Sequence, residues 1–283
     1  MQFAIAQVSS LPFSFADDVA GFAAGGCHAI EVWLTKLEDY LKEHSRSELD
    51  ALLDKHGMAL PVASLQGGLL ERGPVFDEAW SLFCRRLTLC RDLGISTLVV
   101  AADVSGEPSV LRAQQVIDCL RRAADQAAQH RVRLALEFRA ASTLLNNLET
   151  TIAILHQIQH PHLGLCLDVV HLHVGPSKYE DLRYLRREDL FHVQLADLAD
   201  VPRELASDAD RILPGEGDIG WGPILHTLKQ IDYQGTVAIE LMNPRLWQTG
   251  PRQLAQVAMA CLERLFAIQA ADRKAASEHE RAR

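Results

Sequence analysis

The chain has 283 residues with 28 basic and 37 acidic side chains, so its formal net charge of −9 argues against a nucleic-acid partner. Hydrophobic residues make up 48% of the chain and its mean hydropathy is near zero, which suits a single globular domain. No apolar run approaches the roughly 20 residues that span a bilayer, and the N-terminus MQFAIAQVSS lacks the basic start of a signal peptide. We therefore expect a cytoplasmic protein with a small-molecule partner and no membrane partner.

The six cysteines include no C-x-x-C pair and mostly lie inside apolar segments. This distribution is typical of small core residues and predicts neither a disulfide framework nor a zinc knuckle.

Along the chain, apolar strand-like runs alternate with amphipathic helical stretches, which is typical of parallel βα units. Eight strands are predicted, at residues 3–8, 29–34, 60–64, 97–101, 133–138, 163–168, 191–195 and 236–241. Helical patterns between them include residues 77–93, 109–130 and 148–158, and several are closed by Gly or Pro. Eight such units predict an α/β protein that is a single (β/α)8 TIM barrel. An open doubly wound sheet is less favoured because no G-x-G-x-x-G follows the first strand.

The length fits this fold, since such barrels typically need about 250 residues. We assign residues 1–269 to the barrel. Residues 270–283 are charged and rich in alanine, and they predict a fraying helix or a loose tail without chemistry of its own.

Four consecutive strand-like runs carry a potential metal ligand at or near their carboxyl end: Glu137, Asp168, Gln194 and Glu240. The ends of parallel strands meet at one edge, so these side chains can converge on one site. Any one of them is explained as well by a solvated loop, but the set of four is not. Three carboxylates and an amide oxygen favour Mn²⁺ or Mg²⁺ and tolerate Co²⁺ or Zn²⁺. The sequence therefore predicts one divalent metal ion.

Several motifs then resemble a known family: IEVW at residues 30–33, LDVVH at 167–171, VQLAD at 193–197, RILPGEGDI at 211–219 and GTVAIEL at 235–241. With Glu137, they make the chain similar to the xylose isomerase-like TIM barrels, which include sugar phosphate isomerases and epimerases, hydroxypyruvate isomerase, inosose dehydratase and 3-dehydroshikimate dehydratase. The resemblance implies metal ligation by the same four residues, with His171 and Arg211 facing the substrate. Many sugar epimerases of the family have His where this chain has Gln194, whereas hydroxypyruvate isomerase and the 3-dehydroshikimate dehydratases resemble it in using Gln.

Proton abstraction next to a carbonyl requires a base and a way to hold the developing enediolate, and a divalent ion does the second as a Lewis acid. Glu137 and Glu240 are the predicted proton-transfer pair. Arg211 would grip a substrate oxygen, and His171 would position a hydroxyl or pass a proton. The plainer alternatives are that Arg211 pairs with a nearby aspartate, Asp208 or Asp210, on a surface loop and that His171 is a rim histidine.

Further candidates for substrate contact lie just beyond other strand ends or in loops: Glu31, Gln66, Ser207, Glu216 and Trp247. Three of them have a structural alternative. Glu31 would bond a neighbouring strand, Glu216 would be a rim loop residue and Trp247 would be ordinary packing. His173 and His192 are expected to be structural.

Two enzymatic functions follow. The first is a metal-dependent isomerase or epimerase of a keto sugar or related hydroxy-carbonyl compound. The alternative is a dehydratase of the 3-dehydroshikimate or inosose type, favoured by Gln194, by HPHLGLCLD at residues 160–168 and by Ser207 four residues before Arg211. Against it, ASLQGGLLERG at residues 63–73 replaces the Pro-Phe-Arg type of segment found in those dehydratases.

A different kind of function is an abasic-site endonuclease, which needs three metal ions and further histidine ligands. The first three predicted strands end on Val8, Leu34 and Ser64 instead. A non-catalytic sugar-binding barrel stays open, as does a homo-oligomeric state.

Overall fold

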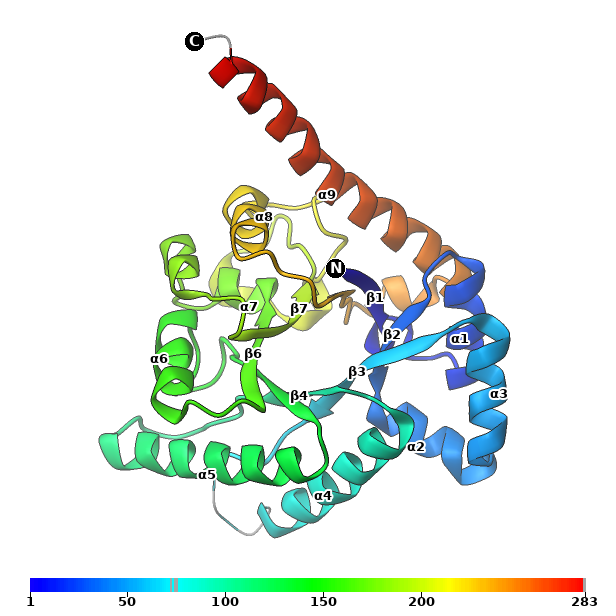
Figure 1. Cartoon of the computed structure of the whole chain (residues 1–283), viewed down its shortest axis with the longest axis vertical. Coiled ribbons are helices and arrows are strands. Elements are labelled where there is room, and N and C mark those ends of the chain that lie inside the picture. The colour runs from blue at the N-terminus through cyan, green and yellow to red at the C-terminus, as the bar shows by residue number, and fades with distance from the viewer. Residues whose placement is uncertain (72, 74–75, 282–283) are drawn as a thin grey trace.

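The computed structural model describes residues 1–281 except 72, 74 and 75, with side chains described as far as residue 267. Eight parallel strands follow one another in chain order and close into a barrel, which confirms the predicted (β/α)8 fold. Helices surround the ring of strands (Figure 1). The strands are β1 Gln2–Ala6, β2 Ala29–Trp33, β3 Ala59–Gln66, β4 Thr97–Ala101, β5 Arg133–Glu137, β6 Leu163–Asp168, β7 Leu190–Leu195 and β8 Thr236–Ile239.

The α-helices are α1 Phe15–Ala24, α2 Leu34–Glu43, α3 Arg46–His56, α4 Phe76–Leu93, α5 Val110–Gln129, α6 Leu148–Ile158, α7 Val169–Val174, α8 Trp221–Gln230 and α9 Pro251–Arg281. Short 3-10 turns are η1 Gln7–Ser10, η2 Tyr179–Tyr184, η3 Arg203–Leu205, η4 Asp208–Asp210 and η5 Leu246–Gln248. Capping boxes built on Ser14 and Ser45 begin α1 and α3, because each serine and the acid three residues later satisfy backbone N–H groups of the first turn.

The observed boundaries differ from the predicted ones mainly at strand ends that meet the site. β1 ends at Ala6 rather than residue 8, because η1 turns the chain there. β8 ends at Ile239, so Glu240 lies just beyond the sheet. Helix α7 follows β6 without a loop, because the side chain of Asp168 accepts hydrogen bonds from the backbone N–H groups of Val170 and His171 and caps the helix.

The strand register brings the predicted ligand positions to one rim of the barrel. Asp168 lies beside Gln194 in the pairing of β6 with β7, and Glu137 lies beside Cys166 in the pairing of β5 with β6. The barrel interior below this rim is filled by small and branched side chains, including Val62, Val99 and Ala135. A site at this rim therefore stands on a packed core.

Helix α9 continues to Arg281 and projects away from the barrel (Figure 1). Its last turns include most of the predicted tail, so the backbone there is helical rather than a loose tail. The domain boundary at residue 269 stays a prediction. Among the described residues, no helix is both long and apolar enough to cross a membrane. Five of the six cysteines are buried as expected, and Cys84 is partly buried.

Candidate metal and proton-transfer site

Four carboxylates gather at the carboxyl-end rim of the barrel: Glu31 on β2, Glu137 on β5, Asp168 on β6 and Glu240 after β8. We call these four the acidic cluster. Their exposed fractions are 0%, 4%, 0% and 7%. Buried carboxylates are costly unless cations or hydrogen-bond donors face them, so the neighbours of the cluster decide what it can do.

Arg211 is the main positive neighbour and is only 1% exposed. Its Nη1 lies 2.8 Å from Asp168 Oδ2 and 3.0 Å from Glu240 Oε2. Its Nε and Nη2 lie 2.9 Å and 2.8 Å from Asp208 Oδ1. The pairing with Asp208 was the plainer of the two expected roles, yet the arginine points into the barrel mouth rather than along a surface loop.

The two carboxylates that share Arg211 have opposite pKa shifts. Burial alone would raise the pKa of Asp168, but Arg211 and His171 outweigh it and hold that pKa at about 2. For Glu240, burial raises the pKa well above its usual value, Arg211 offsets part of this, and the negative charges of Glu31, Asp168 and Glu137 add to the rise. Asp168 is thus kept ionised, whereas Glu240 is disposed to hold a proton.

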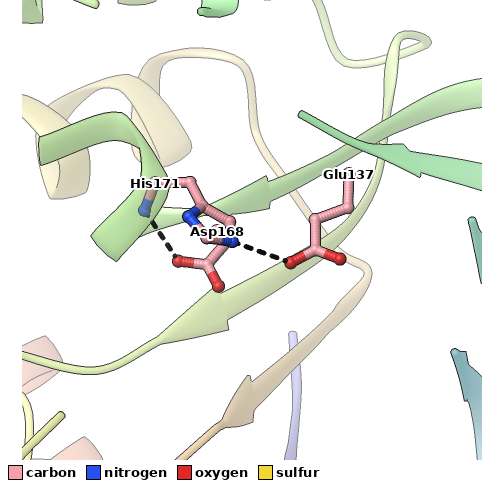
Figure 2. A group of neighbouring side chains, drawn as sticks. All are labelled: Glu137, Asp168 and His171. Carbon is pink, nitrogen blue, oxygen red and sulfur yellow. Dashed lines mark hydrogen bonds and ion pairs between the residues drawn. The ribbon is translucent and has the colours of Figure 1, made fainter. Parts of the chain in front are cut away.

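His171 joins two members of the cluster (Figure 2). Its Nε2 lies 3.4 Å from Glu137 Oε1, and its backbone N–H donates to Asp168 Oδ1 at 3.1 Å. Burial lowers the pKa of His171, but the carboxylates of Asp168 and Glu137 outweigh this and raise that pKa above its ordinary value. The ring is therefore a proton donor placed at the edge of the cluster.

The residues fit a divalent cation. Ligand atoms of Glu137, Asp168 and His171 all lie within 4.8 Å of one another, a metal-binding arrangement found among the described residues. Asp168 Oδ2 is buried and accepts no hydrogen bond, although Arg211 Nη1 is close to it. Four buried carboxylates also exceed the positive charge that Arg211 and one imidazolium supply. The carboxylate oxygens of the cluster are hard donors, which suit a divalent ion.

Gln194 lies among the carboxylates but faces them with its amide nitrogen. Its Nε2 donates to Glu31 Oε1 at 2.9 Å and to Glu240 Oε1 at 3.0 Å, while its Oε1 accepts from the Cys166 thiol at 3.1 Å. The predicted position of Gln194 beside Asp168 and Glu240 is thus observed. Ligation through Oε1 would require the amide to turn over, so that role remains a prediction.

Glu31 is held within the protein from across the barrel. His192 Nε2 lies 2.7 Å from Glu31 Oε2, and His192 Nδ1 lies 3.1 Å from the carbonyl oxygen of Thr236. The structural alternative for Glu31 was a hydrogen bond to a neighbouring strand. Glu31 does bond within the protein, but its partner lies on β7, which is not a neighbour of β2. His192 is fully buried, in keeping with the structural role expected of it.

The remaining substrate-contact candidates have other partners. Ser207 is exposed and donates to Asp210 Oδ2 at 2.8 Å, closing the turn η4. Gln66 Nε2 donates to the carbonyl of Gly67, Trp247 Nε1 donates to the carbonyl of Val8, and Glu216 lies 3.8 Å from Arg264 on α9. Within the described part of the chain, Gln66, Ser207, Glu216 and Trp247 make no hydrogen bond or ion pair with the acidic cluster.

Asp197 was not singled out in the sequence, yet it organises the loop that carries Arg211. Its buried carboxylate accepts hydrogen bonds from the N–H groups of Gly215 and Ile219 at 2.8 and 3.0 Å and from Trp221 Nε1 at 2.8 Å. Its backbone also exchanges two hydrogen bonds with Ile212. An acid at the end of the VQLAD motif, two residues after a strand, was the available signal.

A pocket with a volume of about 470 Å³ opens beside the cluster. His171, Ser207 and Asp208 line it, together with Arg139 from the loop after β5. Its size falls in the range of about 300–1,000 Å³ that is usual for small-molecule sites.

Known proteins resemble this chain over most of its length. The family model described as "Xylose isomerase-like TIM barrel" matches residues 20–274. The inosose isomerase of Bacillus velezensis is 27% identical over 81% of this chain and 84% of its own length. The 3-dehydroshikimate dehydratase of Pseudomonas aeruginosa is 27% identical over 86% of this chain but only 38% of its own length. A 1.8 Å crystal structure of the IOLI protein with a bound zinc atom has a TM-score of 0.88 at 24% identity, covering 94% of this chain and 98% of that one, and supports the fold.

Proposed function

The chain belongs to the xylose isomerase-like TIM barrel family, and from this premise we propose that it is a divalent-metal-dependent isomerase of a hydroxy-ketone of the inosose or keto-sugar class. The relatives are named enzymes, which confirms the prediction of an enzyme. The observation that carries the proposal is the acidic cluster, which has more buried carboxylates than its positive neighbours balance.

Glu137, Asp168, Gln194 and Glu240 are the proposed ligands. A divalent ion held there would polarise a carbonyl oxygen and so acidify the adjacent C–H bond. Mn²⁺ or Mg²⁺ suits the oxygen donors, and the bound zinc of the IOLI structure supports a divalent ion without fixing its identity.

The protein groups then divide the proton transfer between them. Glu137 is the proposed base, since it sits against His171 at the rim. Glu240 is the proposed second carboxylate of the proton-transfer pair, which would return the proton while it also holds the metal. Arg211 bonds Asp168 and Glu240 and holds both carboxylates in place. His171 would orient a substrate hydroxyl beside the pocket.

The test is solvent exchange. The purified chain is stripped with a chelator, reloaded with Mn²⁺ and incubated in D₂O with an inosose and with D-allulose, and NMR follows deuterium at the carbon next to the carbonyl. We expect deuterium uptake and an isomerised product, both lost on chelation and on Glu137→Gln. Exchange that survives chelation would remove the proposal, and so would a lack of exchange with both neutral compounds and with an anionic hydroxy-ketone such as a ketose phosphate.

A dehydratase is the second candidate, and His171 is the observation that favours it. Elimination of water needs an acid for the departing hydroxyl, and the raised pKa of His171 at the edge of the pocket suits that task. The resemblance to 3-dehydroshikimate dehydratases points the same way. With 3-dehydroshikimate in the same assay, an unsaturated product formed with loss of water would select this function over isomerisation.

A further inference from the structure

We infer that the 470 Å³ pocket beside the acidic cluster binds an anionic group of the substrate, a carboxylate or a phosphate, through Arg139 and Arg203. The inference rests on the proposed function for the reaction, and it adds the chemical class of the substrate.

The pocket is linked to the acidic cluster through two of its lining residues. His171 contacts Glu137, and Asp208 binds Arg211, which pairs with Asp168 and Glu240. One wall is apolar and includes Val170 and Val174 from α7. Such a pocket can take the carbon frame of a substrate whose carbonyl lies at the acidic cluster.

The charges on the opposite walls are arranged for an anion. Arg203 in η3 forms no ion pair with any residue that the structure describes, and Glu204 beside it is exposed. Arg139 lies 3.8 Å from Asp208 Oδ2, a loose contact, because Asp208 Oδ1 already binds Arg211 through two nitrogens. Both guanidinium groups therefore have donors left for a ligand, and a guanidinium binds carboxylate and phosphate oxygens in pairs.

A second, smaller hollow supports this assignment. It has a volume of about 230 Å³, shares Arg203 with the first pocket and is lined also by Lys178 and His173. His173 Nδ1 is buried there without a hydrogen-bond partner. Arg139 and Lys178 thus line the two hollows that share Arg203. Three acids line them as well, Glu180, Glu204 and Asp208, and of these Asp208 is already bound to Arg211.

The distinction matters because the relatives differ in substrate charge. An inosose is neutral, whereas 3-dehydroshikimate carries a carboxylate. The Pro-Phe-Arg type of segment is replaced at residues 63–73, and Arg139 and Arg203 are the arginines that line this pocket.

The first experiment measures binding without turnover. Isothermal titration of the chelator-treated full chain uses inorganic phosphate and 3-dehydroshikimate as separate probes, with Arg139→Gln, Arg203→Gln, the double variant and the control Arg121→Gln. Arg121 is an exposed arginine of α5, near Asp118 and outside the pocket. At least one probe should bind the natural chain, each single pocket variant should weaken it roughly tenfold, and Arg121→Gln should not. The probe that binds shows whether the group is a phosphate or a carboxylate.

The inference fails if neither probe binds, or if the double variant binds as the natural chain does. Because no metal or turnover is required, this failure is separate from a failure of the proposed function. The second experiment uses the Mn²⁺-loaded chain and compares kcat/KM for 3-dehydroshikimate with that for an inosose. The ratio should fall roughly tenfold in each pocket variant, and an unchanged ratio would contradict a role in substrate charge.

Discussion

The molecule contains two groups of buried charged side chains that differ in their ratio of acidic to basic residues. Asp18 of α1 and Lys36 of α2 form a buried pair at 2.7 Å, one acid with one base, backed by Gln7 and the carbonyl of Ser10. The acidic cluster has four carboxylates, and Arg211 pairs with two of them, Asp168 and Glu240. Each group contains a buried carboxylate oxygen without a hydrogen bond, Asp18 Oδ1 and Asp168 Oδ2. The orphan oxygen is therefore not the mark of a functional site; the excess of negative charge is.

The largest expected effect comes from removing the cation of each group. Arg211→Met and Lys36→Met should each lower the free energy of unfolding by about 3–5 kcal/mol, because each leaves buried carboxylate without its partner. Mn²⁺ should restore much of the loss in Arg211→Met and none in Lys36→Met. Urea unfolding with and without Mn²⁺ measures both, and equal responses of the two variants to the ion would erase the distinction between the groups.

The next effect is on turnover. Glu137→Gln and Glu240→Gln should each lower kcat by at least about 10²-fold, since the amide keeps an oxygen but loses the proton-transferring carboxylate. Asp18→Asn, checked for folding by circular dichroism, should stay within about twofold of the natural chain. Steady-state rates with Mn²⁺ decide this, and near-normal solvent exchange in Glu240→Gln would leave a single-base route through Glu137 or His171.

A smaller effect is expected at the support of Arg211. Asp197→Asn turns an acceptor of several hydrogen bonds into a group with a competing donor, and should cost about 1–3 kcal/mol of unfolding free energy. Because the loop carrying Arg211 loosens, kcat should fall while the Tm gain from Mn²⁺ persists. Loss of metal binding with unchanged kcat would show that Asp197 acts on the ligands instead.

The smallest effect separates the two groups by pH. Burial raises the pKa of Asp18 from 3.8 to about 6 despite Lys36, so between pH 4 and 6 the folded chain holds a proton that the unfolded chain has lost. This contribution to stability is present below pH 4 and declines as pH rises towards 6, by less than about 1.4 kcal/mol per pH unit. Asp168 acts oppositely: with a pKa near 2, its contribution is present above pH 4 and lost as pH falls. Asp18→Asn should reduce the loss of unfolding free energy between pH 4 and 6, measured by denaturant unfolding at a series of pH values. If the variant loses as much stability over this range as the natural chain, another group causes the loss.

The fold could be predicted from the sequence because each barrel strand is recognisable locally, by its length and its apolar content. The positions of Glu137, Asp168 and Glu240 could be predicted too, since parallel strands in order bring their carboxyl ends to one rim. The family resemblance placed Arg211 at the site, but the strand pattern alone could not, because a loop 29 residues before Glu240 has to fold back for the two to meet. Nor could it show the bond from His192 to Glu31, which joins residues 161 positions apart. Gln194 was found by position, while its amide orientation depends on Cys166, a neighbour across strands.

Anomalous diffraction from crystals grown with Mn²⁺ tests the central claim most directly, that the unbalanced cluster is a divalent metal centre. The account predicts one strong peak at the barrel rim in contact with Glu137 and Asp168, with Gln194 and Glu240 completing the set, and no peak at the balanced pair of Asp18 and Lys36. A peak only elsewhere, or a rim that stays empty at saturating Mn²⁺ with Arg211 still bonded to Asp168 and Glu240, would contradict it.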